Sequence, residues 1–242
     1  MTRRAVDTWW AAARAAAGLL IAAAIVAQAD VTIGGAVTAG RDAATTIVNF
    51  FSFFTILSNV GAAIVLLWAA VWLLRARGDA ATEPRGLALT LASVSTYMIV
   101  TGIVYNALLR GIPLPQGTTV PWSNEVLHVV GPLFLLADVL FAPRRRCLGR
   151  RAVLIVLVFP IVWVVYTLVR GPLVVNPVDG SPWWYPYPFL DPHSATTGGY
   201  GGVIAYVAGI AVAIAIVAAG VVWVGRRRDA RRRAGATAIA DV

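Results

Sequence analysis

The sequence has little charge, no lysine and a single cysteine. Only 13% of its 242 residues are charged and 59% are hydrophobic, whereas ordinary soluble domains are roughly 25% charged. This balance excludes an ordinary soluble fold. Cys147 has no second cysteine with which to form an internal disulfide, and neither a Cys/His zinc spacing nor a glycine-rich nucleotide motif is present. We therefore expect no metal and no other cofactor.

The hydrophobic residues are grouped into long blocks, several of which reach the roughly 20 residues that cross a bilayer core. Glycine and proline mark the segments between the blocks. We interpret residues 1–225 as one transmembrane domain and residues 226–242 as a basic tail. The sequence thus predicts an all-α bundle of six transmembrane helices at about Trp9 to Ala29, Phe51 to Leu74, Leu87 to Leu109, Trp122 to Phe141, Ala152 to Arg170 and Tyr200 to Val224.

The arginines predict how this bundle is oriented. Seventeen of the 20 lie near the N-terminus, in the second and fourth connections and in the C-terminal tail; the others are Arg41, Arg110 and Arg170. By the positive-inside rule, both termini face the cytoplasm of a multi-pass protein in the plasma membrane. Because the arginines alternate with the connections, membrane lipids explain them better than nucleic acid does, and no nucleic-acid partner is expected.

The first hydrophobic block has a second interpretation. Arg3 and Arg4, the apolar run and the triplet Ala27-Gln28-Ala29 also resemble a cleavable signal peptide, whose removal would leave five helices. We favour retention, because the stretch that begins near Trp9 is long enough to span a bilayer. A mature protein beginning at Asp30 would contradict the six-helix prediction.

Polar residues inside apolar helices are costly in lipid, so they indicate where function lies. In the predicted orientation, Thr55 lies about 6 Å below the outer start of the second helix, and His128 about 9 Å below that of the fourth. The inner half is expected to be nearly bare apart from Asp138, which we expect to pair with Arg144 or a neighbour. The other polar residues expected near the outer leaflet are Asn59, Tyr105, Glu125, Tyr166, Arg170 and Asp191.

Most of these residues also have a structural interpretation. A membrane threonine often bonds to the carbonyl one turn back, tyrosines anchor helices at the interface, and Glu125 suits a helix start. His128 is harder to explain in this way. It is the one histidine inside a predicted helix, and its side chain titrates near neutral pH.

Several segments together resemble a known family. They are FFSFFTILSN from Phe50 to Asn59, Leu127-His128 with Pro132 downstream, YTLVRG from Tyr166 to Gly171, and the stretch from Tyr185 to Asp191. They look like a bacterial six-transmembrane family related to the androgen-induced and androgen-dependent TFPI-regulating membrane proteins of animals. The animal proteins are intramembrane threonine hydrolases of fatty acid esters of hydroxy fatty acids.

The resemblance implies a hydrolase of lipid esters with Thr55 as nucleophile and His128 as general base. The sequence differs from the animal pattern around both residues, so the substrate stays open. A threonine hydroxyl needs an adjacent base, and either Glu125 or Asp191 could orient the histidine. Oxyanion donors are sought among Asn59, Tyr105, Tyr166 and Arg170. The alternative is a non-catalytic lipid-binding or small-molecule transport protein whose outer polar pocket recognises a head group.

Overall fold

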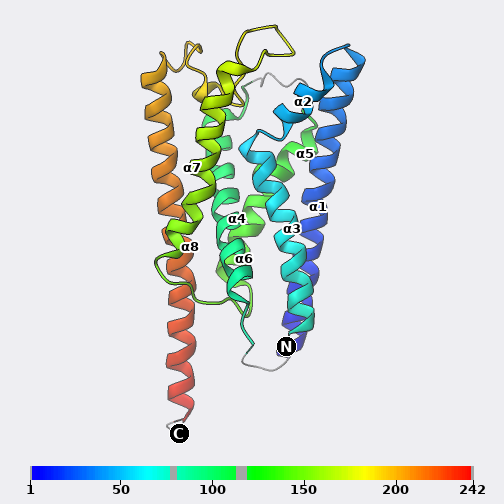
Figure 1. Ribbon diagram of the computed structural model, residues 1–242. Coiled ribbons are helices and arrows are strands. Elements are labelled where there is room, and N and C mark those ends of the chain that lie inside the picture. Colours follow the sequence, from blue (N-terminus) through cyan, green and yellow to red (C-terminus); the bar gives the residue numbers. More distant parts are fainter. Residues whose placement is uncertain (1, 77–80, 113–118, 241–242) are drawn as a thin grey trace.

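The computed structural model describes residues 2–76, 81–112 and 119–240, which form a bundle of helices without strands (Figure 1). The predicted all-α class is confirmed. Arg77 in the second predicted connection, and Pro113 and Pro115 in the third, lie outside these residues. The α-helices are α1 (Arg3–Thr38), α2 (Ala43–Phe50), α3 (Phe54–Arg75), α4 (Arg85–Val104), α5 (Pro121–Glu125), α6 (Gly131–Phe141), α7 (Ala152–Arg170) and α8 (Tyr200–Ala240); the π-helical segments are η1 (Tyr105–Leu109) and η2 (Val126–Val130), and the 3₁₀ segments are η3 (Gly171–Leu173) and η4 (Pro188–Leu190).

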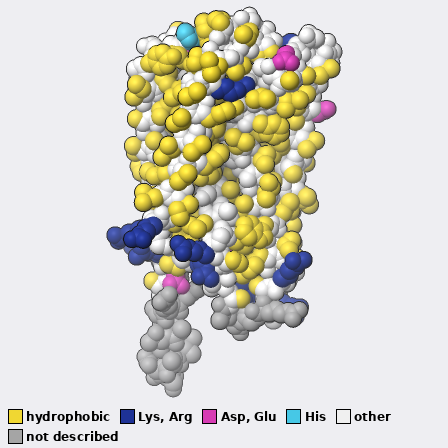
Figure 2. Space-filling model, viewed as in Figure 1, with side chains coloured by type: hydrophobic (Ala, Val, Ile, Leu, Met, Phe, Trp, Pro, Cys, Tyr) yellow, Lys and Arg dark blue, Asp and Glu magenta, His cyan; other side chains and the backbone are white. Residues whose placement is uncertain are grey.

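Six helical stretches of the described chain are long and apolar enough to cross a membrane, which confirms the predicted helix number. Hydrophobic side chains cover the middle of the visible face, and arginines gather mainly near its lower end (Figure 2). The chain is therefore a multi-pass membrane protein. Helix α1 begins and α8 ends at the same end of the bundle, here called the termini end; the opposite end, which carries α2 and the α7–α8 connection, is called the loop end (Figure 1).

Two helices extend beyond their predicted bounds. Helix α1 continues through Gly34 and Gly35 to Thr38, and the chain turns at Gly40, whose φ is 64°. A glycine inside a helix costs only about 1 kcal/mol relative to alanine, whereas a positive φ strongly favours glycine, so the turn falls at the last of the three. Helix α8 continues past Val224 because the alanines and arginines that follow are strong helix formers.

Helix α4 lies at the centre of the bundle, packed against α3, α6, α7 and α8. Close approach to α6 depends on Gly102, since a Cβ there would lie 2.9 Å from Cβ of Pro132. On its other side, the Tyr97 hydroxyl donates to the Val156 carbonyl of α7 at 2.7 Å. That carbonyl is free because Pro160, four residues on, has no N–H to donate to it. Both prolines thus shape the packing around α4.

A buried ion cluster joins four segments at the termini end. The fully buried Arg14 of α1 contacts Asp138 of α6 at 2.7 Å and Glu83 of the α3–α4 connection at 3.2 Å. Arg145 of the α6–α7 connection reaches the same two carboxylates, at 2.7 Å for Asp138 and 3.7 Å for Glu83. Trp10 also donates to Asp138, at 2.8 Å. The cluster therefore balances two arginines with two carboxylates.

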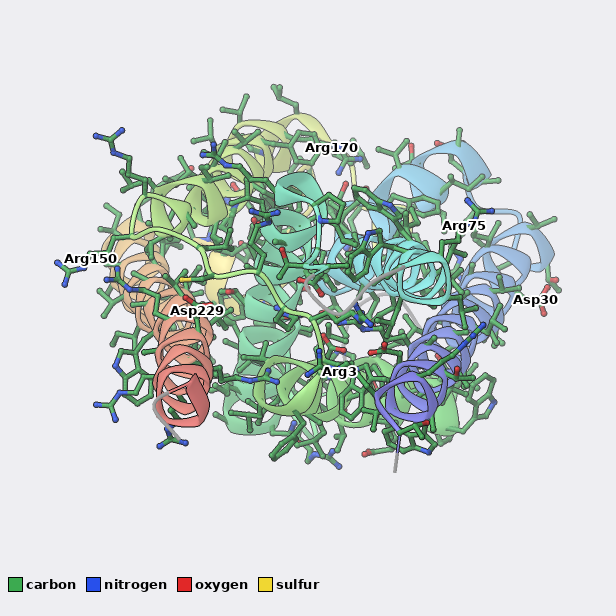
Figure 3. All side chains as sticks on the ribbon, turned by 90° about the horizontal axis from the view of Figure 1, so that it is seen from below. Arg3, Asp30, Arg75, Arg150, Arg170 and Asp229 are labelled. Atoms are coloured by element: carbon green, nitrogen blue, oxygen red, sulfur yellow. The ribbon has the colours of Figure 1, made fainter. Side chains whose placement is uncertain are left out.

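The expectation of a nearly bare inner half is wrong at this cluster. The expected pairing of Asp138 with Arg144 or a neighbour is confirmed at Arg145, but Asp138 also pairs with Arg14, and Arg144 itself pairs with Asp7 at 2.8 Å. Arg14 lies 11 residues after the start of α1, hence about 16 Å along the helix, so it belongs to the core and not to a terminal segment. In contrast, Arg150 points away from the bundle when seen from the termini end (Figure 3).

The cluster predicts how two arginine substitutions differ in stability. Arg14→Ala leaves buried carboxylates short of a cation and is expected to lower the free energy of unfolding by about 3 to 5 kcal/mol. The matched control is Arg110→Ala, because its pair with Glu125 at 3.0 Å is nearly half exposed and is worth about 0 to 1 kcal/mol. Thermal unfolding in detergent measures both variants; equal losses would contradict the assigned role of Arg14.

Candidate active site

Thr55 lies in the first turn of α3, where backbone N–H groups have no partner within the helix. The N-cap residue Phe53 offers no side-chain hydrogen bond. Instead, the Tyr187 hydroxyl of the α7–α8 connection accepts from the Thr55 N–H at 3.1 Å, and it also lies 3.1 Å from Thr55 Oγ1. A tyrosine from a distant segment therefore caps the helix at the candidate nucleophile.

The α7–α8 connection reaches Thr55 because it folds into the loop end of the bundle. Its Trp184 and Tyr187 are buried and make edge-to-face contacts with Phe53, with ring centroids 5.7 and 5.4 Å apart. Gly171 lets the connection pack closely, since a Cβ there would overlap the Tyr185 ring. Burial raises the pKa of Tyr187 above its usual value, so its phenol stays protonated and able to donate.

His128 lies in η2, with Nδ1 2.9 Å from the Asn124 carbonyl. A carbonyl can only accept, so Nδ1 carries the proton, and in the neutral ring Nε2 keeps a lone pair. The imidazole stacks on Tyr105 with centroids 3.9 Å apart, and Asn124 donates to the Tyr105 hydroxyl. Asn124 thus fixes the histidine directly through its carbonyl and indirectly through Tyr105. In the resulting tautomer, Nε2 is the ring nitrogen that can accept a proton.

Thr55 and His128 line the same cavity of about 50 Å³. Thr55 also lines a second, mainly apolar cavity of about 250 Å³ between α3, α4, α7 and α8. Within the described chain the two side chains share no hydrogen bond, since Thr55 is bonded to Tyr187 and His128 to Asn124. The residues common to both cavities are Thr55, Tyr105, Leu109 and Tyr187.

Asn59 lies one helical turn after Thr55 on α3 and supports the site from there. It is fully buried, and its amide donates to the Thr55 carbonyl at 2.9 Å and to the Leu127 carbonyl at 3.2 Å. It therefore ties the first turn of α3 to the segment that carries His128. Of the residues expected from the sequence, Thr55, Asn59, Tyr105 and His128 come together here.

The remaining four lie outside the two cavities that Thr55 lines. Glu125 pairs with Arg110, and Asp191 accepts from the backbone N–H of His193 at 2.9 Å, so the Asn124 carbonyl and neither carboxylate holds His128.

Tyr166 and Arg170 instead fasten α7 to the segment around α2. Tyr166 shares a hydrogen bond with Ser52 at 2.9 Å, and Arg170 donates to Asn49 at 2.7 Å while lying over the Trp184 ring. Both residues hold the segment that leads into α3, and neither contacts Thr55 itself.

Sequence reasoning missed three residues of the site: Tyr187, Asn124 as the histidine partner, and Gln28. Gln28 lines the small cavity, donates to Thr32 at 3.0 Å and accepts from the Val120 N–H at 3.0 Å. The sequence does carry a signal for Gln28, because it is a polar residue in an apolar helix, but its triplet Ala27-Gln28-Ala29 also resembles a signal-peptide cleavage site. Tyr187 stood out as the tyrosine between Pro186 and Pro188.

Comparisons of the chain with family models, curated proteins and solved structures find no match in any of the three. In the described part of the chain, no three His, Cys, Asp or Glu side chains are grouped so as to hold a metal ion. The arrangement itself offers a hydroxyl at a helix N-terminus, a histidine with a free nitrogen and an adjoining apolar cavity. These are elements that nucleophilic acyl transfer uses.

Two glycines of α4 provide a matched test of how this site is positioned. A Cβ on Gly102 would lie 2.9 Å from Pro132 and 3.3 Å from the His128 carbonyl, whereas one on Gly86 would have its nearest neighbour, Trp68, at 4.0 Å. Gly102→Ala is expected to push η2 and α6 away and to destabilise the protein by about 1 to 3 kcal/mol. Gly86→Ala is expected to leave the melting temperature unchanged or slightly higher. Similar melting temperatures for both variants would contradict the close packing at Gly102.

Proposed function

We propose that the protein is an intramembrane hydrolase of lipid esters, with Thr55 as nucleophile and His128 as general base. The observation that carries the proposal is that both residues line one cavity while Nδ1 of His128 is bonded to Asn124, which leaves Nε2 free for the threonine proton. The sequence resemblance to the animal threonine hydrolases supports the same two residues.

In the proposed reaction, Thr55 Oγ1 attacks the ester carbonyl carbon as its proton passes to His128 Nε2. The carbonyl oxygen becomes an oxyanion, which the positive end of α3 and the Thr55 N–H stabilise. Tyr187, 3.1 Å from both Thr55 atoms, can exchange its present hydrogen bonds for one to the oxyanion. The bond to the alcohol then breaks, and His128 returns the proton to the alcohol oxygen. Water repeats the sequence on the acyl-threonine and releases the fatty acid.

We further propose that both termini face the cytoplasm of a bacterial plasma membrane, so that the site lies near the outer leaflet. The arginines of the termini end support this orientation. A lipid ester already in the outer leaflet then needs to move only sideways to reach Thr55. The partners of the protein in this proposal are membrane lipids.

The second candidate is a non-catalytic lipid-binding or transport protein, and the apolar cavity of about 250 Å³ would suit it as well. The hydrogen bonds favour the hydrolase. A carrier has no need of a histidine whose Nε2 is left free, or of a threonine hydroxyl that Tyr187 holds in the first turn of α3.

The catalytic proposal predicts the effect of substitutions on activity-based labelling. Purified protein is expected to label with a fluorophosphonate and to hydrolyse lipid esters, while Thr55→Ala and His128→Ala each lower the rate by at least about 100-fold. The matched control is Thr96→Ala, because Thr96 is also buried but, within the described chain, its hydroxyl bonds to the Ala92 carbonyl one turn back and to no residue of the site. Activity that survives both Thr55→Ala and His128→Ala would reject the assigned roles.

The orientation predicts which side of the membrane reaches Cys147, the single cysteine, which is exposed in the α6–α7 connection. A membrane-impermeant maleimide is expected to leave intact cells unlabelled at this residue and to label it in inverted vesicles. Cys147→Ser is the control for background. Labelling in intact cells would reverse the proposed topology.

A further inference from the structure

The two cavities that meet at Thr55 differ in chemistry as well as in size. The large one, about 250 Å³, has hydroxyl groups only from Thr55, Thr101, Tyr105 and Tyr187, and the rest of its lining is apolar. Long hydrocarbon chains suit such a surface because their burial is favourable and leaves no polar group unpaired.

The large cavity reaches the lipid-facing surface between α7 and α8. Ile161 of α7 and Ala211 of α8 line it and are both exposed, Ile161 to 58%. Pro160, in the middle of α7, lines the cavity beside them. A hydrocarbon chain can therefore pass from the surrounding lipid into the cavity without crossing a polar barrier.

The small cavity has a different lining. It combines apolar residues with a larger share of polar ones: besides His128, the polar residues absent from the large cavity are Gln28, Thr32, Thr119 and Asn124, and the apolar ones include Phe50, Phe53, Ile56 and Leu127. Gln28 is itself bonded to Thr32 and to the Val120 backbone. Its volume of about 50 Å³ is enough for about three to five water molecules. That space suits a small hydroxylated group and is far too short for a second long chain.

We propose that the substrate is an ester of one long-chain fatty acid with a small polar alcohol, such as glycerol. The acyl chain occupies the large cavity, the alcohol occupies the small one, and the ester carbonyl lies at Thr55 between them. This inference rests on the proposed hydrolase. It differs from what the family resemblance implies, since a fatty acid ester of a hydroxy fatty acid carries a long chain on both sides of its ester.

The same arrangement accounts for both halves of the reaction. The alcohol leaves into the small cavity, and His128, which lines that cavity, gives it the proton taken from Thr55. Water then replaces the alcohol in that cavity, loses a proton to His128 and attacks the acyl carbon, and the fatty acid stays in the apolar cavity until it exits to lipid. Each step uses the histidine on the side where the polar group lies.

The decisive experiment compares two esters of the same acid with the purified full chain. Palmitoyl glycerol and the palmitoyl ester of hydroxystearic acid carry the same acyl group and differ in the alcohol. The expected result is that kcat/KM is at least about tenfold higher for palmitoyl glycerol. Equal or better hydrolysis of the two-chain ester would overturn the substrate inference while leaving the hydrolase intact. Hydrolysis of neither ester, nor of any other lipid ester, would overturn both.

Two variants test separately whether the acyl chain occupies the large cavity and the alcohol the small one. Ala211→Phe fills the large cavity and is expected to shift the preferred acyl length of glycerol esters to shorter chains. The control is Val212→Phe, since the adjacent Val212 is 58% exposed and does not line the cavity. An unshifted chain-length profile in Ala211→Phe would overturn the acyl assignment.

For the small cavity, Gln28→Leu replaces a polar wall with an apolar one. It is expected to reduce the preference for glycerol over the two-chain alcohol by about tenfold or more while keeping the wild-type acyl-length profile. The acyl-length profile shows whether the variant is folded. An unchanged alcohol preference in a variant with this profile would overturn the assignment of the small cavity.

Discussion

Inside an apolar bundle in lipid, a polar group has no water to bond with and must find its partner in the protein. This constraint determines how both ends of the structure are built. At the termini end, Arg14 is buried 11 residues into α1, and it is held by Asp138 and Glu83 from distant segments. At the loop end, the open first turn of α3 is capped by Tyr187. In each case a polar group that its own helix cannot satisfy fixes the position of another segment.

At the candidate site, this pairing of polar groups within the protein is incomplete. Asn124 satisfies Nδ1 of His128, and Asn59 joins the Thr55 turn to the histidine segment through two carbonyls. Nε2 of His128 has no protein hydrogen bond among the described residues, and it belongs to a side chain that lines a cavity. A structural role alone would not require this free nitrogen, since a histidine that only filled space could be replaced by an apolar ring. The proposed role of His128 as general base rests on this free nitrogen.

Much of the fold could be predicted from the sequence because it depends on local pattern. Apolar blocks of sufficient length predict the six membrane spans. The rise of about 1.5 Å per helical residue predicts a similar depth for Thr55 and His128, in keeping with the cavity that they share. The pairings could not be predicted in this way. Arg14 and Asp138 are 124 residues apart, and Thr55 and Tyr187 are 132 apart. Such contacts depend on which helices are neighbours, and neither hydropathy nor arginine counting determines that.

Arg14 also shows why charge near a terminus is ambiguous. Positive-inside counting places Arg14 with Arg3 and Arg4 near the N-terminus, although Arg14 follows Trp9, where the first predicted helix begins. In the structure, α1 begins at Arg3 and carries Arg14 into the core. The remaining arginines of the termini end still outnumber those of the loop end, so the proposed orientation of the bundle does not depend on Arg14. The packing of α1 does depend on Arg14, because a helix that supplies a buried cation to two carboxylates is part of the bundle's core. Helix α1 also supplies Gln28 to the small cavity, so the ion cluster at one end holds in place a helix that lines the candidate site at the other.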